Sequence, residues 1–159
     1  MQKMTLIIWF AVALYSPGFV SAAIWYVSGG APAGGDGTSW ERAFRAIQDG
    51  IDASSDGDTV IVGQGTYVEN VQLNGKNIVL RSTDPSEPGI VQSTIIDGNR
   101  ADSVVSFLGT EKASCVLAGF TIQNGKADYG GGIRGGTQET QTLATIRNNI
   151  IVRNRADEG

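Results

Sequence analysis

Short runs of β-branched residues separated by glycine-bearing turns are the feature that most constrains the fold of this chain. Residues 56–82 (DGDTVIVGQGTYVENVQLNGKNIVLRS) contain three such runs, at residues 59–62, 66–73 and 77–80, with no helical pattern between them. Strands this short cannot bury a face alone, so they must stack on further strands of the same kind. The pattern returns at residues 95–98, 119–125 and 149–154. We therefore predict an all-β fold in which successive coils stack as a parallel β-helix.

The composition limits the classes of function. The chain has 159 residues, enough for one domain, and 41% of them are apolar, enough for a buried core. Its net charge is −4 and its basic residues are scattered, so we expect no nucleic-acid partner, because nothing here could neutralise a run of phosphates. Histidine, the commonest general base and zinc ligand, is absent. Cys115 is the single cysteine, which excludes a disulfide within the chain.

Residues 1–22 have the three parts of a secretory signal peptide. Lys3 supplies the positive charge, residues 5–15 form an uncharged apolar segment, and Ala22 ends a small-residue site for cleavage before Ala23. The apolar segment is too short to cross a bilayer comfortably, so we expect no stable membrane span after cleavage. The alternatives are an N-terminal anchor or a buried helix. The signal peptide predicts a secreted or cell-surface protein.

Residues 23–57 are predicted to begin and cover the stack. A first strand at residues 24–27 is followed by a glycine-rich loop at residues 29–37. Thr38 and Glu41 have the spacing of a capping box at the start of a helix. Apolar residues then recur at helical spacing, at Trp40, Ala43, Phe44, Ile47 and Ile51. We expect this amphipathic helix to cap the N-terminal end of the stack, where an open sheet edge invites aggregation.

Residues 58–159 are predicted to form three coils of three strands each. The second coil is expected to use residues 91–96, 103–108 and 115–123, and the third residues 132–134, 142–146 and 149–153. Alternation of apolar residues aligns the third strands, so that Leu80, Ile122 and Val152 share one interior and Asn124 stacks over Asn154. The sequence stops directly after the last strand. We expect either a fragment of a longer β-helix, which we favour, or another element that covers this end.

Several segments resemble the pectin-lyase-like superfamily of secreted proteins. They are WYV at residues 25–27, AFRAIQDGIDA at 43–53, DGDTVIVGQGTYVENV at 56–71, STIIDG at 93–98, LAGFTIQNG at 117–125 and YGGGI at 129–133. The resemblance covers most of residues 24–154 and implies a right-handed parallel β-helix. The superfamily includes polysaccharide lyases, glycoside hydrolases, pectin esterases, phage tailspikes and adhesin-like proteins. It therefore implies an extracellular polysaccharide as partner without settling an activity.

Two turns carry the candidate substrate-binding residues. Asp128, Tyr129 and Arg134 flank a run of three glycines, where the tyrosine ring could stack on a sugar and the two charged groups could bind hydroxyls or a uronate. The alternative is a tight glycine turn that lets neighbouring coils approach closely. Asp97 and Arg100, in the turn after a strand, have the residue types of a lyase site, but Asp97 could equally cap that turn.

No catalytic set is complete. Residues 65–69 (GTYVE) resemble a short motif of pectin methylesterases, but Glu69 could simply be solvated or cap a turn. Asp36, Asp56 and Asp58 do not assemble the six to eight oxygens that Ca²⁺ requires, so no cofactor is predicted and calcium remains an alternative. We therefore expect a polysaccharide-binding surface protein. The alternative is the N-terminal part of a polysaccharide lyase or glycoside hydrolase whose catalytic residues lie elsewhere.

Overall fold

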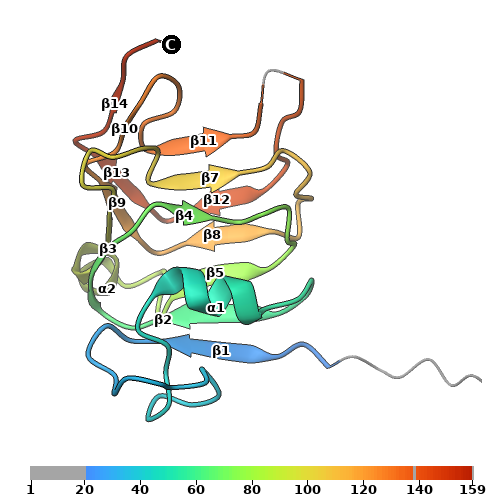
Figure 1. The fold of residues 1–159 in the computed structure, drawn as a ribbon, viewed down its shortest axis with the longest axis vertical. Coiled ribbons are helices and arrows are strands. Elements are labelled where there is room, and N and C mark those ends of the chain that lie inside the picture. The colour runs from blue at the N-terminus through green and yellow to red at the C-terminus, as the bar shows by residue number, and fades with distance from the viewer. Residues whose placement is uncertain (1–20, 138, 159) are drawn as a thin grey trace, which may run out of the picture.

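Parallel strands dominate the computed structural model, which describes residues 21–137 and 139–158 (Figure 1). The predicted signal peptide falls almost entirely on residues 1–20, outside the described residues. Three sheets contain all but two of the strands. The first has the order β1 (Ile24–Val27), β2 (Thr59–Val62), β5 (Val79–Ser82), β8 (Val116–Ala118), β12 (Thr145–Arg147). The second has β3 (Gly65–Val68), β6 (Thr94–Asp97), β9 (Thr121–Gln123), β13 (Ile150–Val152).

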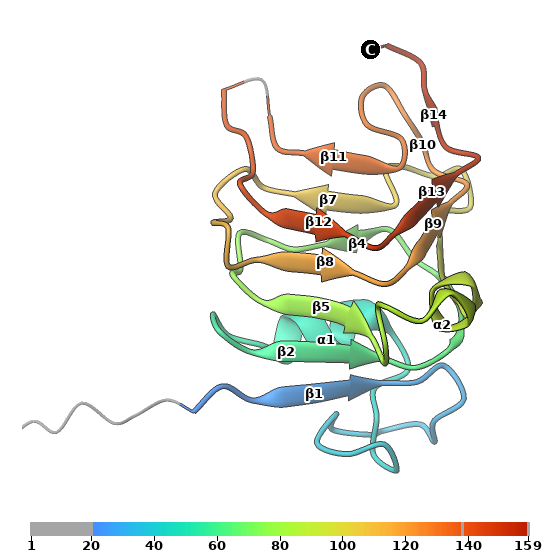
Figure 2. The same cartoon turned by 180° about the vertical axis from the view of Figure 1, so that it is seen from behind.

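The third sheet consists of β4 (Val71–Gln72), β7 (Val105–Phe107) and β11 (Ile133–Gly135), and a short ladder joins β10 (Lys126–Ala127) to β14 (Arg155–Ala156). From β2 to β13 the chain visits the first, second and third sheets in rotation, with β10 placed between β9 and β11, whereas β1 precedes this rotation and adds a strand to the first sheet alone. Every pair of these strands is parallel. Figure 2 shows the first sheet rising from β1 to β12, as the all-β prediction requires.

The core lies between the three sheets, where inward side chains of paired strands stack in columns. In the first sheet Val60 pairs with Leu80, and Leu80 with Leu117. In the second, Tyr67 pairs with Ile96, and Ile96 with Ile122. These side chains are fully or almost fully buried. Burial of an aliphatic side chain of this size contributes about 1.5–3 kcal/mol, so the columns supply much of the stability.

The predicted alignment of third strands is wrong in register. Leu80 stacks on Leu117 in the first sheet, whereas Ile122 belongs to the second sheet and stacks on Ile96 and Ile151. Val152 pairs with Gln123 and is exposed. The apolar pattern predicts one strand over residues 115–123, but this segment contains two strands. The chain turns at Gly119, whose φ is 86°, and passes from β8 in the first sheet to β9 in the second.

The predicted ladder of Asn124 on Asn154 is also wrong. Asn154 lies over Gly125, accepts a hydrogen bond from the Gly125 N–H (2.7 Å) and donates to the Ile122 carbonyl (2.9 Å). Asn149 spans the preceding turn in the same way, accepting from the Phe120 N–H (2.9 Å) and donating to the Leu117 carbonyl (2.9 Å). Each asparagine therefore satisfies one donor and one acceptor of the coil beneath it.

Two other predicted strands have different boundaries. Residues 66–73 divide into β3 and β4, which belong to different sheets. Residues 91–96 begin inside a short helix, α2 (Pro88–Ser93), and become strand only at Thr94. Pro88 favours this helix because its fixed φ and missing N–H suit a first helical turn. The side chain of Glu87 accepts from the Gly89 N–H and caps the helix.

The predicted helix begins later than its apolar spacing indicated. Helix α1 spans Ile47–Ala53, and residues 38–46 form turns, so the capping box of Thr38 and Glu41 does not form. Phe44 instead binds the free edge of β1, donating from its N–H to the Tyr26 carbonyl and accepting from the Ser28 N–H. These bonds use backbone groups that a longer helix would need. The loop of residues 28–46 thus covers the edge of β1.

Helix α1 covers the lower edge of the third sheet, below β4 (Figure 1). The Gln48 side chain accepts from the Gln72 N–H (2.9 Å) and donates to the Gln72 carbonyl (3.2 Å), as a neighbouring strand would. Both ends of the helix are capped by side chains from distant segments. Glu69 accepts from the N–H groups of Ile47 and Gln48, and the Lys76 ammonium donates to three carbonyls at the last turn.

Candidate functional site

Four of the five predicted site residues lie around one hollow of about 440 Å³ on the flank of the later coils. Arg100 and Asp102 come from the turn after β6, Lys126 from β10, and Arg134 from β11. This charged hollow is lined by Arg100, Ala101, Asp102, Lys126, Ala127, Asp128, Tyr129, Arg134 and Asp157. Three cationic and three acidic side chains therefore surround one opening.

Tyr129 provides the aromatic surface of the charged hollow. Its side chain comes from the loop between β10 and β11 and is 52% exposed. Its hydroxyl donates to Oε2 of Glu158 (2.6 Å), and this bond raises the pKa of Tyr129. The ring is thus fixed at its tip while the rest of its surface is accessible to a ligand.

Exposed ion pairs hold the charged groups at the rim. The Arg134 guanidinium lies 3.9 Å from Oδ1 of Asp102, and the Lys126 ammonium lies 3.7 Å from Oδ2 of Asp157. Pairs this exposed contribute little to stability, on the order of 0–1 kcal/mol. A ligand hydroxyl could therefore displace either contact at small cost. The arrangement supplies hydrogen-bond donors and acceptors on both sides of the tyrosine.

Asp97 does not line the hollow. Its carboxylate accepts hydrogen bonds from the Asn99 N–H (2.9 Å), Nε2 of Gln123 (3.0 Å) and Nδ2 of Asn124 (2.7 Å). Burial acts to raise the pKa of Asp97, but these donors outweigh it and leave the pKa below its usual value. The carboxylate organises the turn and the coil above it, which is the alternative that the sequence left open.

Sequence analysis missed Asp102, Lys126, Asp157 and Glu158. Lys126 pairs with Arg155, which lies 29 residues later. The same spacing places Asp157 and Glu158 over Asp128 and Tyr129. The Asp157 N–H donates to the Ala127 carbonyl, and the Glu158 N–H donates to the Asp128 carbonyl. The spacing from Leu117 to Ile146 is also 29 residues, so this period was the signal that could have found them.

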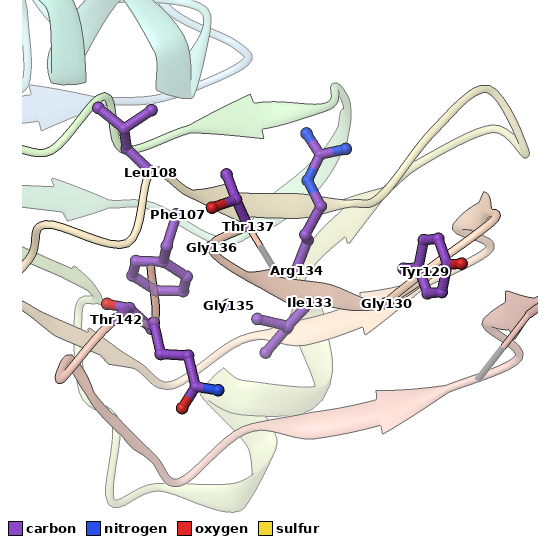
Figure 3. A pocket seen from close by; sticks show the side chains of 11 residues that line it. Phe107, Leu108, Tyr129, Gly130, Ile133, Arg134, Gly135, Gly136, Thr137 and Thr142 are labelled. Carbon is purple, nitrogen blue, oxygen red and sulfur yellow. The ribbon is translucent and has the colours of Figure 1, made fainter. Parts of the chain in front are cut away.

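A second cavity, of about 730 Å³, adjoins the charged hollow and shares Tyr129 and Arg134 with it. Figure 3 shows Ile133 and Arg134 pointing to opposite sides of β11, with Phe107 on the side of Ile133. Ile133 stacks on Val105, while Gly135 pairs with Phe107 and has no side chain to cover its ring. This cavity lies beside the third sheet, with Phe107 and Ile133 in its lining, and differs in character from the polar hollow.

The other candidate groups are engaged in the fold. The Asp58 carboxylate accepts from the Ala23 N–H, the Trp25 indole and the Ser55 N–H, and Asp56 accepts from Asn77. Burial raises the pKa of Cys115 to about 11. Among the described residues, no group of three or more acidic, histidine or cysteine side chains is arranged to hold a metal ion. No helix in the described ranges has the length and apolar character to cross a membrane.

A comparison with known proteins finds a relative of this chain. Over 112 residues, 69% of this chain, the sequence is 33% identical to a protein named Cell surface glycoprotein from Methanothermus fervidus. The matched region is 16% of the length of that protein. No protein family and no solved structure matches the chain.

Proposed function

We propose that this chain is a section of a right-handed parallel β-helix of the pectin-lyase-like kind, located outside the cell, whose charged hollow binds an extracellular polysaccharide. The rotation of the chain through three parallel sheets supports the β-helix, since connections between parallel strands are almost always right-handed. The signal-like N-terminus and the name of the relative support the location. The aromatic and charged side chains that line the hollow support a polysaccharide as its ligand.

The observation that carries the binding proposal is the convergence of Arg100, Asp128, Tyr129 and Arg134 on one opening. Sugar rings offer an apolar face for an aromatic ring and hydroxyls that both donate and accept hydrogen bonds. In the hollow, the ring of Tyr129 can stack on the apolar face of a sugar, and the paired cations and carboxylates can bind its hydroxyls. The near balance of charge favours hydroxyl recognition over capture of a polyanion by charge alone.

Binding is tested with the purified chain and a panel of pectate, alginate and neutral glucans, each with and without calcium. We expect measurable affinity for at least one of them. Tyr129→Ala and Arg134→Ala should each weaken that affinity about tenfold, because truncation of a central tyrosine or arginine costs on the order of 1–2 kcal/mol. Lys112→Ala is the matched control, since it removes an exposed cation that lies outside the hollow.

Each outcome decides a part of the proposal. Unchanged affinity in both hollow variants would place the binding site elsewhere, and no affinity for any glycan would reject the function. Chain cleavage in the same assay, seen as new reducing ends or unsaturated products, would favour the alternative of a lyase or hydrolase. The circular dichroism of each variant checks that the fold is retained.

A further inference from the structure

Ala23 anchors the chain to the first coil. Its N–H donates to Oδ1 of Asp58 (2.7 Å), and its carbonyl accepts from the Thr59 N–H (2.9 Å) at the start of the β1–β2 ladder. Ser21 and Ala22, directly before it, are exposed and belong to no strand. The boundary between exposed and bound chain therefore lies at the Ala22–Ala23 peptide bond.

The sequence predicts signal-peptide cleavage at this same bond. Ala22 ends the small-residue cleavage site that follows the apolar segment, so Ala23 is the predicted first residue of the mature chain. That prediction depends on residues 1–22 alone, whereas the hydrogen bonds of Ala23 depend on Asp58 and Thr59. Two independent observations therefore mark one bond. Cleavage there leaves all of β1 in place.

Asp58 has the environment of a carboxylate that lacks an ion-pair partner. It is 5% exposed and accepts hydrogen bonds from the N–H groups of Ala23 (2.7 Å) and Ser55 (2.9 Å) and from the Trp25 indole (3.1 Å). Burial acts to raise the pKa of Asp58, but these donors outweigh it and leave the pKa below its usual value. The carboxylate is therefore ionised at neutral pH. None of the ion pairs within residues 21–137 and 139–158 includes it, although a buried charge is normally paired.

Lys76 is engaged elsewhere and does not serve as that partner. Its ammonium group donates to the carbonyls of Ile51 (2.6 Å), Asp52 (2.9 Å) and Ser54 (2.8 Å). These three bonds use all three protons of the ammonium group. The nitrogen of Ala23, in contrast, already lies at hydrogen-bond distance from Asp58.

We propose that cleavage before Ala23 converts its amide nitrogen into an α-ammonium group that forms a buried ion pair with Asp58. Hydrolysis adds one water across the peptide bond, so that Ala22 leaves with the new carboxylate and Ala23 retains the new amine. An α-amino group has an ordinary pKa of about 7.7–8.0 and is protonated at neutral pH. The neutral N–H donor of the precursor thus becomes a charged donor, and its bond to the carboxylate becomes charge-assisted.

The precursor and the mature chain therefore differ in the strength of the first coil. Asp58 joins Trp25 on β1 to Ser55 in the turn before β2, so its ion pair stabilises the contact between the first two strands of the first sheet. In the precursor this contact depends on neutral donors alone. The inference rests on the export of the chain, which is part of the proposed function, and is independent of the ligand of the hollow.

The first test is the N-terminus of the exported protein. The full chain is produced in a host that exports it, and mass spectrometry of the secreted protein should give Ala23 as its first residue. Another first residue on a secreted protein would overturn the inference and leave the extracellular location intact. Retention of the uncleaved chain inside the cell would contradict both.

The second test compares two forms released from a fusion partner, one that begins at Ala23 and one that begins at Ser21. The longer form keeps a peptide bond at Ala23. We expect the midpoint of thermal unfolding at pH 7 to be several degrees higher for the form that begins at Ala23. Asp58→Asn should abolish this difference. Asp56→Asn is the matched control and should preserve it, since Asp56 is exposed and binds the Asn77 N–H (2.8 Å).

A pH series gives the same decision if Asp58→Asn does not fold. Pairing raises the pKa of the folded amine, so the difference between the two forms should be complete below the ordinary α-amino pKa. It should disappear as the pH rises through the raised value. Lys76, whose charge also acts on Asp58, is present in both forms and cancels in the comparison. Equal midpoints at pH 7, a difference that persists in Asp58→Asn, or one that persists at alkaline pH overturns the proposal.

Discussion

Carboxylates in this protein act as acceptors for backbone N–H groups at turns. Glu111 shows this most completely. Its side chain is buried and accepts from the N–H groups of Leu108 (2.8 Å), Gly109 (2.9 Å) and Gly75 (3.0 Å), so it joins two successive coils. Burial acts to raise the pKa of Glu111, but these donors outweigh it and hold the pKa below its usual value. The carboxylate is therefore part of the fold in its charged form.

Glu111→Gln should destabilise the protein at neutral pH. The amide retains the shape but replaces one charged acceptor oxygen with a donor that faces N–H groups, at a cost of about 1–3 kcal/mol. Because the folded pKa is depressed, the unfolded chain takes up the proton first. The contribution of Glu111 is therefore complete near pH 7, begins to fall near the ordinary glutamate pKa of about 4.3, and is lost as the pH falls through the lower folded pKa. Denaturant unfolding from pH 7 to pH 3 should show a difference between the variant and the original protein that narrows with falling pH. A constant difference would contradict this account.

At the scale of elements, helix α1 depends on groups outside itself. It has seven residues, too few to persist alone, and its N-cap residue Ala46 provides no side-chain cap. Glu69 satisfies the first N–H groups and Lys76 the last carbonyls, in agreement with the polarity of a helix. Helix α1 is therefore stabilised by side chains of the first coil and depends on that coil for its structure.

Glu69→Gln should lower the free energy of unfolding by about 1–2 kcal/mol, because it weakens two charge-assisted bonds at a helix N-terminus. Chemical denaturation measures the loss. Asp49→Asn is the control, since Asp49 is an exposed acid in the first turn of the same helix. If the two variants lose the same stability, the effect comes from general charge and Glu69 has no specific capping role.

The sequence predicted the presence of the strands and the helix better than their boundaries. β-branched runs predicted the strands, and the parallel sheets agree with the all-β expectation. The predicted register was wrong because the chain passes from the first sheet to the second at Gly119, whereas the prediction placed residues 115–123 in a single strand. The predicted start of the helix was wrong because Ala43 and Ile47 are both buried although the chain between them is not helical. The spacing of apolar residues predicts which side chains are buried. It does not predict the backbone conformation of Phe44, which is set by its hydrogen bonds to β1.

The candidate site was predicted in part for a similar reason. Aromatic or charged residues in predicted turns can be recognised from the local sequence. Arg100, Tyr129 and Arg134 were predicted in this way, and all three line the hollow. Asp157 and Glu158 lie one coil later and reach the site only through the stacking of β14 on β10. Their contribution depends on the register between coils, which no local pattern contains.

At the scale of the molecule, stability should decrease from β1, whose edge is covered by the loop of residues 28–46, to the last coil with β12 and β13. The inward residues of β5 and β8 are enclosed by coils on both sides, while those of β12 and β13 have a neighbour on one side only. In stacked repeats, each unit is stabilised mainly by its nearest neighbours. The last coil should therefore open locally without the rest of the stack.

Hydrogen exchange followed by mass spectrometry checks this gradient. Peptides that cover β12 and β13 should exchange at least tenfold faster than peptides that cover β5 and β8, which corresponds to a difference of about 1.4 kcal/mol in opening free energy. Uniform protection along residues 59–158 would show that the coils unfold as one cooperative unit and would contradict the prediction.

The dependence of α1 on Glu69 and Lys76 has a consequence for biosynthesis. The groups that complete the N-terminal cover lie more than 20 residues downstream of the helix start. During synthesis, the segment before them emerges first and has no partner for its ends. Helix α1 can therefore have both of its ends capped only after Glu69 and Lys76 have been synthesised.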